Sequence, residues 1–88
     1  MHFYIEYELS PDTRDEAQKR FLEAGGLPPA GITMLQRWHY ASGHRGFIIA
    51  QADDAIGIGK WMQDWTDLLV FDITPILSDE EFQQVIQQ

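Results

Sequence analysis

The chain has 88 residues, and its 44% of hydrophobic and 12% of aromatic residues are enough to build one core, so a wholly disordered chain is not expected. Fourteen acidic residues against six basic ones give a formal net charge of −8 at pH 7, with the basic residues scattered along the sequence. Nucleic acids and anionic membranes require clustered basic side chains, so neither is an expected partner. The absence of cysteine excludes disulfides, thiolate zinc sites and iron–sulfur clusters.

The sequence also bears on localisation. Residues 1–9 lack the basic start and the long apolar run of a signal peptide. No apolar stretch approaches the roughly 20 residues that a helix needs to span a bilayer. We therefore expect a cytoplasmic protein.

The first part of the chain predicts a strand followed by a helix. Residues 3–9 alternate between apolar and polar side chains, which is the period of a strand. Ser10 and Pro11 are typical of a helix start, and Gly25 of a helix end, because glycine adopts the left-handed conformation without a Cβ penalty. The apolar spacing of this helix predicts a buried stripe of Ala17, Phe21, Leu22 and Ala24.

Two strand-like runs, 32–40 and 46–52, flank a short loop that contains glycine, which is typical of a hairpin. Neighbouring residues in a strand point to opposite faces, so Arg37 and His39 are expected on one side and Trp38 on the other. The alternation places three further side chains with Trp38, namely Met34, Gln36 and Tyr40.

The last part of the chain predicts a helix, an edge strand and a tail helix. Asp53 or Asp54 caps a helix that runs to about Trp65. Residues 69–77 alternate as a fourth strand, and Pro75 favours a sheet edge because it cannot donate a ladder hydrogen bond. Residues 78–86 begin with a capping-box pattern and continue as a short amphipathic helix, whose apolar residues are Phe82, Val85 and Ile86.

This order of elements predicts an α+β, ferredoxin-like β-α-β-β-α-β domain over residues 1–88 with a short C-terminal helix. Both crossover helices then cover the same face of the sheet. The other face combines apolar and charged groups: Tyr4, Glu6, Val70, Asp72, Thr74 and Ile76. We expect a second subunit to cover this face as a homodimer and to enclose a wet pocket there. The alternative is a monomer with a half-wetted sheet, which antiparallel sheets tolerate.

Several short runs form a combined pattern: Gln36-Arg37-Trp38-His39, Gly46-Phe47-Ile48-Ile49, Ala52-Asp53-Asp54, Trp61 to Trp65, Asp67-Leu68-Leu69 and Thr74-Pro75. The pattern covers nearly the whole chain and resembles an uncharacterised bacterial family known as domain of unknown function 3303. The resemblance implies the dimeric α/β-barrel superfamily, in which two ferredoxin-like subunits join their sheets. That superfamily includes cofactor-free monooxygenases, haem-degrading oxygenases, muconolactone isomerases and proteins without known activity, so membership does not select a reaction.

The leading candidates for chemistry are His39 and Arg37. Histidine exchanges protons near neutral pH, and arginine can hold an anionic or carbonyl oxygen, so the two predict a pocket base beside a ligand-binding cation. The alternative for His39 is an interface histidine that is satisfied by a backbone carbonyl.

Five other residues complete the candidate set. Glu6 and Asp72 are expected on adjacent strands, where two close carboxylates form an acid–base pair; alternatively, Glu6 neutralises Arg37 across the sheet. Trp61 and Trp65, one helical turn apart, can form one wall of a site for an aromatic ligand, although tryptophans at this spacing more often belong to the core. Tyr4 is the remaining ligand-binding candidate.

The sequence favours a homodimeric protein that binds a small hydrophobic or aromatic molecule. One alternative is a cofactor-independent monooxygenase or isomerase that uses His39 and Arg37. A further alternative is a haem-binding or purely structural dimer module. No cofactor is predicted, and His39 and His44 lack the spacing of a dedicated metal site.

Overall fold

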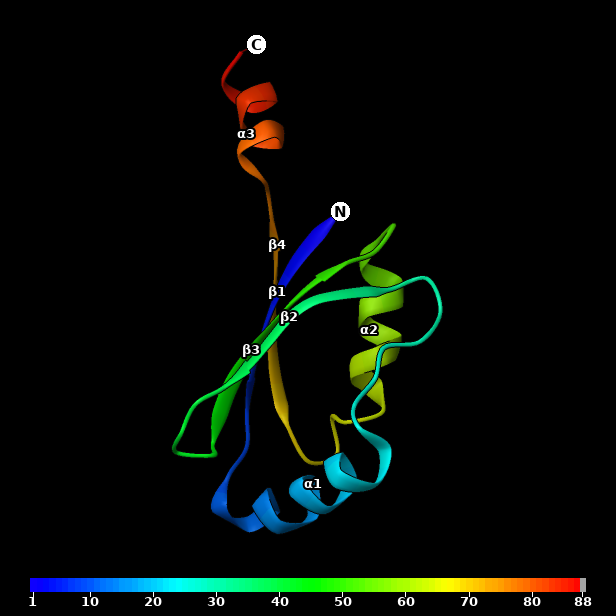
Figure 1. The fold of residues 1–88 in the computed structure, drawn as a ribbon, viewed down its shortest axis with the longest axis vertical. Helices are drawn as coiled ribbons and strands as arrows, with labels where there is room; N and C mark the ends of the chain where they lie inside the picture. Colours follow the sequence, from blue (N-terminus) through cyan, green and yellow to red (C-terminus); the bar gives the residue numbers. More distant parts are fainter. Residues whose placement is uncertain (88) are drawn as a thin grey trace.

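The computed structural model describes residues 1–87, which fold in the predicted order of strands and helices (Figure 1). The elements are β1 (His2–Glu8), α1 (Pro11–Ala24), β2 (Thr33–His39), β3 (Arg45–Gln51), α2 (Ala55–Gln63), β4 (Val70–Ile76) and α3 (Asp79–Ile86). Each predicted strand is therefore confirmed, with ends that differ by one residue. The α+β, ferredoxin-like class is confirmed by this order together with the sheet topology.

The four strands form one antiparallel sheet in the order β2-β3-β1-β4. β4 lies at an edge, as Pro75 predicts. The period-2 alternation of β1 separates the two faces of the sheet, since Phe3, Ile5 and Tyr7 are buried while Tyr4 and Glu6 are only partly covered. We call the face of Tyr4 and Glu6 the open face and the opposite one the helix face.

The main core fills the space between the helix face and α2. It consists of Phe3, Ile5, Ile48, Ala50, Ala52, Ile58, Trp61 and Met62. Figure 1 shows α2 lying along one side of the sheet. α1 instead crosses the end of the sheet at which β1 ends. A second, smaller cluster joins Ala17 of α1 to Tyr7 and Leu9. The helix face is thus tightly covered by α2 and only partly covered by α1.

The structure corrects the predicted buried stripe of α1. Ala17 is buried and Phe21 is partly buried, but Leu22 is 84% exposed and Ala24 is also exposed. The reason is that α1 contacts the sheet through only one narrow line of residues at the sheet's end. Gly25 ends the helix as predicted, with a left-handed φ of 76° and its N–H donated to the carbonyl of Phe21.

Two further predictions need correction. α2 ends at Gln63, and Trp65 lies in the turns that follow. In β2 a register shift between Met34 and Gln36 places Met34 opposite Ala50 on the helix face, so Met34 does not share the face of Trp38. A bulge of this kind inserts one extra residue and reverses the alternation on one side of it.

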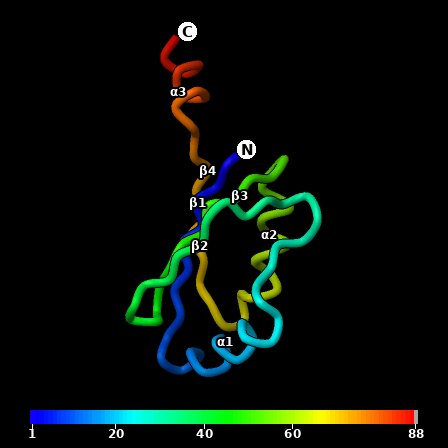
Figure 2. The backbone as a smooth tube through the Cα atoms, viewed as in Figure 1, coloured from blue at the N-terminus to red at the C-terminus, as the bar shows by residue number. Residues whose placement is uncertain are grey.

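The C-terminal helix α3 extends beyond the sheet, in line with β4 (Figure 2). A complete capping box starts it: the Ser78 hydroxyl accepts from the N–H of Glu81, and the Glu81 carboxylate accepts from the N–H of Ser78. The same carboxylate lies 3.2 Å from Nδ1 of His2, which ties the base of α3 to β1. The molecule is accordingly elongated, with extents of 49 × 27 × 17 Å. None of the helices within residues 1–87 has both the length and the apolar character needed to cross a membrane.

Candidate functional site

A cavity of about 270 Å³ lies between the helix face of the sheet and the two helices α1 and α2. Its walls come from every part of the ferredoxin-like unit: Tyr7, Leu9, Ala17, Gln18, Phe21, Gly26, Arg37, His39, Gly43, Ile48, Trp61, Met62, Trp65, Leu69 and Phe71. Most of these side chains are apolar or aromatic. The ionisable groups among them are Tyr7, Arg37 and His39, which converge from β1 and β2.

Tyr7 and His39 lie in one row across the sheet, with Gly46 of β3 between them. The phenol oxygen of Tyr7 lies 2.5 Å from Nδ1 of His39, and the two rings meet edge to face with centroids 5.7 Å apart. Gly46 permits this approach, because a Cβ at that position would overlap the Tyr7 ring and come within 2.5 Å of the Trp38 carbonyl oxygen. The hydrogen bond thus spans two strands across a glycine gap.

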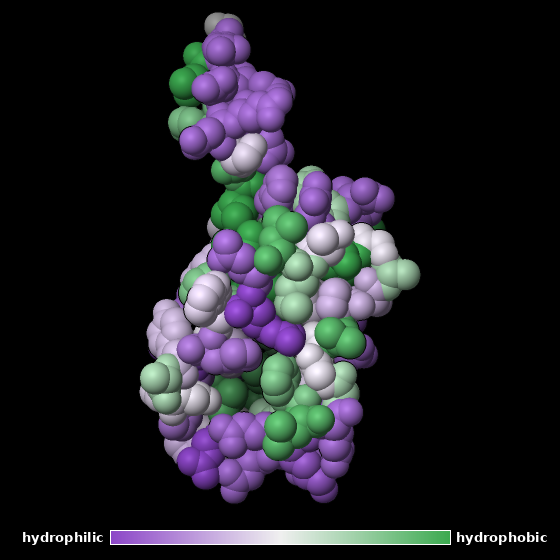
Figure 3. All heavy atoms as spheres, viewed as in Figure 1, coloured by the Kyte–Doolittle hydropathy of each residue, from purple (hydrophilic) through white to green (hydrophobic). Residues whose placement is uncertain are grey.

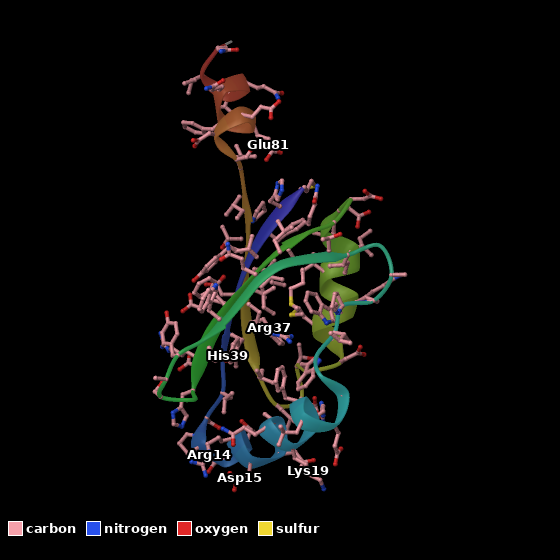
Figure 4. The ribbon with its side chains drawn as sticks, in the orientation of Figure 1. Arg14, Asp15, Lys19, Arg37, His39 and Glu81 are labelled. Carbon is pink, nitrogen blue, oxygen red and sulfur yellow. The ribbon has the colours of Figure 1, made fainter. Side chains whose placement is uncertain are left out.

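Arg37 reaches from β2 toward the end of α1 (Figure 4). Its Nη1 donates to the carbonyl oxygen of Gly26 at 2.8 Å, and its Nη2 donates to that of Gly25 at 3.1 Å. The guanidinium carbon lies 4.8 Å from the centre of the Phe21 ring, a cation–π contact. Arg37 therefore fixes the C-terminal end of α1 against the sheet and holds its charge at the cavity wall.

The environment of the cavity keeps the Tyr7–His39 pair neutral near pH 7. Burial raises the pKa of Tyr7, an effect that the charge of Arg37 partly opposes. Burial, and secondly the charge of Arg37, lower the pKa of His39. A phenol O–H is a stronger donor than an imidazole N–H, so we assign Tyr7 as the donor to Nδ1, with the ring proton of His39 on Nε2. Burial also lowers the pKa of Arg37.

Trp61 and Trp65 both line the cavity. Trp61 is only 2% exposed and also belongs to the main core, so it packs in the core as well as lining the cavity. Trp65 is partly buried, and the Arg20 guanidinium carbon lies 5.6 Å from its ring centre. The same arginine pairs with Asp67, which holds the turn after α2 close to α1.

The structure separates the predicted site residues into two groups. Arg37 and His39 share the helix face, as predicted, together with the two tryptophans. Tyr4, Glu6 and Asp72 lie on the open face, on the far side of the sheet from the cavity. Arg37 and His39 alternate with Trp38 and point toward the helices, so they lie on the opposite side of the sheet from the face where a second subunit was expected to enclose a wet pocket.

The open face has its own arrangement of charges. Glu6 and Asp72 are direct cross-strand neighbours, which confirms their predicted placement on one face. Glu6 does not neutralise Arg37, as the sheet separates them; its carboxylate lies 3.9 Å from Arg45 instead, and Glu8 lies 3.3 Å from the same guanidinium. Aromatic groups accompany these charges, since Tyr4 stacks on Phe47 at 5.5 Å.

Sequence reasoning missed Tyr7, Gln18 and Phe21 as lining residues. Tyr7 belongs to the apolar side of the alternation in residues 3–9, but its role as partner of His39 depends on strand register, which one sequence does not reveal. A usable signal was present in Gly46, since a glycine inside a strand often marks a close approach by a neighbouring group. For Gln18 and Phe21 the signal was their separation by three residues on α1, which puts both on one helix face.

Residues 1–87 contain no group of three or more His, Asp or Glu side chains placed to hold a metal ion. Comparison with curated proteins returns no match. A family model, by contrast, matches residues 1–88. The chain therefore belongs to the family described as Domain of unknown function (DUF3303).

Proposed function

We propose that this protein binds a small, largely aromatic molecule in the cavity between its sheet and its helices. The observation that carries the proposal is an apolar cavity of about 270 Å³ into which three ionisable side chains converge. Ligand sites typically combine apolar walls with a few placed polar groups, and their volumes begin at roughly 300 Å³. A cavity near that lower limit suits a molecule of one or two rings.

Titration of a panel of one-ring and two-ring aromatic compounds tests this proposal, with calorimetry and tryptophan fluorescence as readouts. Trp61 and Trp65 line the cavity, so an occupant should quench their emission. Ala17→Leu should fill the cavity and abolish binding, because Ala17 is buried in its wall. Ala24→Leu makes the same change at an exposed position of α1 and should leave affinity unchanged. If neither the wild type nor Ala24→Leu binds any compound of the panel, the proposal is wrong.

The open face supports a homodimer of the dimeric α/β-barrel type. Trp38 is 61% exposed there, and Val70 is 72% exposed. Apolar side chains of α3 also gather on the side of that helix that faces away from α2, which is the side of the open face (Figure 3). A chain of this size buries only part of its apolar surface by itself. A second copy packed on the open face would bury more of that surface. The Arg45 ion pairs with Glu6 and Glu8 would keep part of that interface wet.

Analytical ultracentrifugation tests the dimer directly, since the chain mass is 10.2 kDa. We expect a species of twice that mass at micromolar concentration. Trp38→Glu should dissociate it, because the indole is exposed in a single subunit and donates only to the Gln36 side chain on the same strand. Leu22→Glu, at an exposed apolar site on α1, is the matched control and should leave the dimer intact. If the wild type sediments as a single chain, the dimer proposal is wrong. The proposal of a ligand in the cavity would still stand, because the cavity lies on the other side of the sheet.

The Tyr7–His39 hydrogen bond favours a second candidate function, proton transfer in a cofactor-independent isomerase or monooxygenase. The Tyr7 oxygen can accept a proton from a ligand while its own proton moves to Nδ1 of His39. Arg37 would then hold the resulting enolate or phenolate oxygen. The low pKa of His39 makes it a weak base in the empty cavity, which is why binding without turnover stands first.

A panel of lactones and quinols tests this second candidate. Turnover should disappear in His39→Ala and fall strongly in Tyr7→Phe. His44→Ala changes the other histidine of the hairpin, which does not line the cavity, and should retain activity. Activity that survives in His39→Ala would exclude the pair as the proton acceptor. We also propose a cytoplasmic location, with which a cysteine-free sequence is compatible.

A further inference from the structure

We infer that the cavity selects anions: its ligand is a planar aromatic compound that presents an ionised oxygen to Arg37. This inference rests on the proposed binding function and adds the charge and shape of the ligand. It follows from three properties of the site, namely a cation without a counterion, unused donor groups on that cation and flat aromatic walls.

Arg37 carries a charge that no carboxylate neutralises among the described residues. The ion pairs of residues 1–87 involve His2, Arg14, Arg20 and Arg45, each with a neighbouring acid. Arg37 instead contacts two carbonyl oxygens and the face of Phe21. Lys19 and Lys60 have no ion pair either, but they do not line the cavity, so Arg37 is the unpaired cation that a ligand there would meet.

The guanidinium retains donors for a ligand. It has five N–H groups, and two of them are engaged by Gly25 and Gly26. These two bonds and the Phe21 contact hold the guanidinium in one orientation, so a ligand oxygen meets a preformed donor set. Preorganised donors of this kind favour an anion over a neutral oxygen, because charge-assisted hydrogen bonds are roughly twice as strong as neutral ones.

The remaining walls suit a planar ring. Phe21, Trp61, Trp65 and Phe71 contribute aromatic surface, and they come from the helices, the turn after α2 and the edge strand. Aromatic surfaces pack best against another ring in offset or edge-on geometry. The polar groups Tyr7, Arg37 and His39 converge from the strands, so an amphipathic ligand with one charged end and one flat apolar end matches both parts of the cavity.

A neutral occupant would fit less well. It would cover Arg37, which is already partly desolvated, without supplying a compensating charge. An anion would supply that charge and would also cancel the effect of Arg37 on His39, whose pKa should rise when the ligand binds.

The test compares 2-naphthoate with 2-naphthamide, which have nearly the same shape but differ in charge. Calorimetry on the wild type should show the carboxylate binding roughly tenfold tighter or more. Arg37→Met should reduce this ratio to about one while keeping some affinity for the amide. Arg14→Met removes the same charge from an exposed position on α1 and should preserve the ratio.

Arg37 also positions the end of α1, so the Arg37→Met variant could fail to fold. A second measurement therefore uses the wild type alone. The Nε–H resonance of Arg37 in the wild type should shift on addition of 2-naphthoate and stay in place with 2-naphthamide. Equal affinity for the two compounds, or an Arg37 resonance that ignores the carboxylate, would overturn anion selectivity and leave the binding function standing. Binding of neither compound would overturn the binding function and this inference together.

Discussion

Tyr7 and His39 are hydrogen-bonded although they belong to strands that are not neighbours. β3 lies between them, and the Tyr7 side chain crosses it above Gly46, the residue in register with both. The row Tyr7–Gly46–His39 therefore joins three strands at the cavity wall. Its geometry depends on a position without a side chain, which makes it open to direct test.

Gly46→Ala should be strongly destabilising. The added Cβ would overlap the Tyr7 ring and come within 2.5 Å of the Trp38 carbonyl oxygen, a backbone atom that cannot move without distorting β2. Overpacking of this type costs about 1–3 kcal/mol of the free energy of unfolding. Urea denaturation measures this loss, and the Tyr7–His39 hydrogen bond should be lost as well. A variant as stable as the wild type would show that the ring does not cross at Gly46.

Tyr7→Phe should remove the hydrogen bond and keep the ring over Gly46. We expect a loss of about 0.5–1.5 kcal/mol in the free energy of unfolding, the net contribution of one such bond. Tyr40→Phe deletes a hydroxyl from a side chain that is 45% exposed and serves as the control, with little expected change. Urea titrations of both variants provide the comparison. Equal effects at the two positions would mean that the contact with His39 adds nothing to stability.

The pKa of His39 makes stability depend on pH in a defined direction. Burial and the charge of Arg37 lower this pKa in the folded state below its usual value of 6.5, while Tyr7, the other ionisable group facing the ring, stays protonated. As pH falls through about 6.5, the unfolded chain gains a proton at this position before the folded chain does, so stability decreases. The decrease ends once the folded-state pKa is passed.

The measurement is urea unfolding of the wild type and His39→Asn at pH 7.5 and 5.5. The wild type should lose more stability between these values than the variant, because the variant lacks the titrating group. His39 belongs to the exposed residues of β2, so the difference should be modest. A variant that loses as much stability as the wild type would contradict the lowered pKa.

Much of the fold was predictable because it depends on local patterns. The alternation of residues 3–9, the Ser10-Pro11 helix start and the capping box at Ser78 each correspond to an element of the structure. The placement of Arg37 and His39 on one face followed from the same period of two. Pro75 correctly indicated an edge strand.

The candidate site was less predictable because it depends on register and on helix placement. One bulge in β2 moved Met34 to the helix face, and no residue type there signals the shift. The pocket was expected on the open face, since the sequence does not reveal that α1 crosses the end of the sheet and leaves space behind it. Leu22 shows the same limit: it fits an amphipathic stripe, yet it is exposed, because Ala17 and Phe21 are the apolar residues of that stripe that turn inward.

Gly59→Ala provides a prediction of opposite sign to Gly46→Ala. Gly59 lies within α2, and a Cβ built there meets no atom within 4 Å. Glycine in a helix interior costs roughly 0.5–1 kcal/mol relative to alanine, mainly because the unfolded chain loses more conformational freedom on folding. The variant should therefore gain about that much in the free energy of unfolding, visible as a higher urea midpoint with an unchanged slope. Since Gly59 does not line the cavity, ligand affinity should stay the same. A stability loss at Gly59 would mean that an unseen contact, such as one made by a partner, occupies the space beside α2.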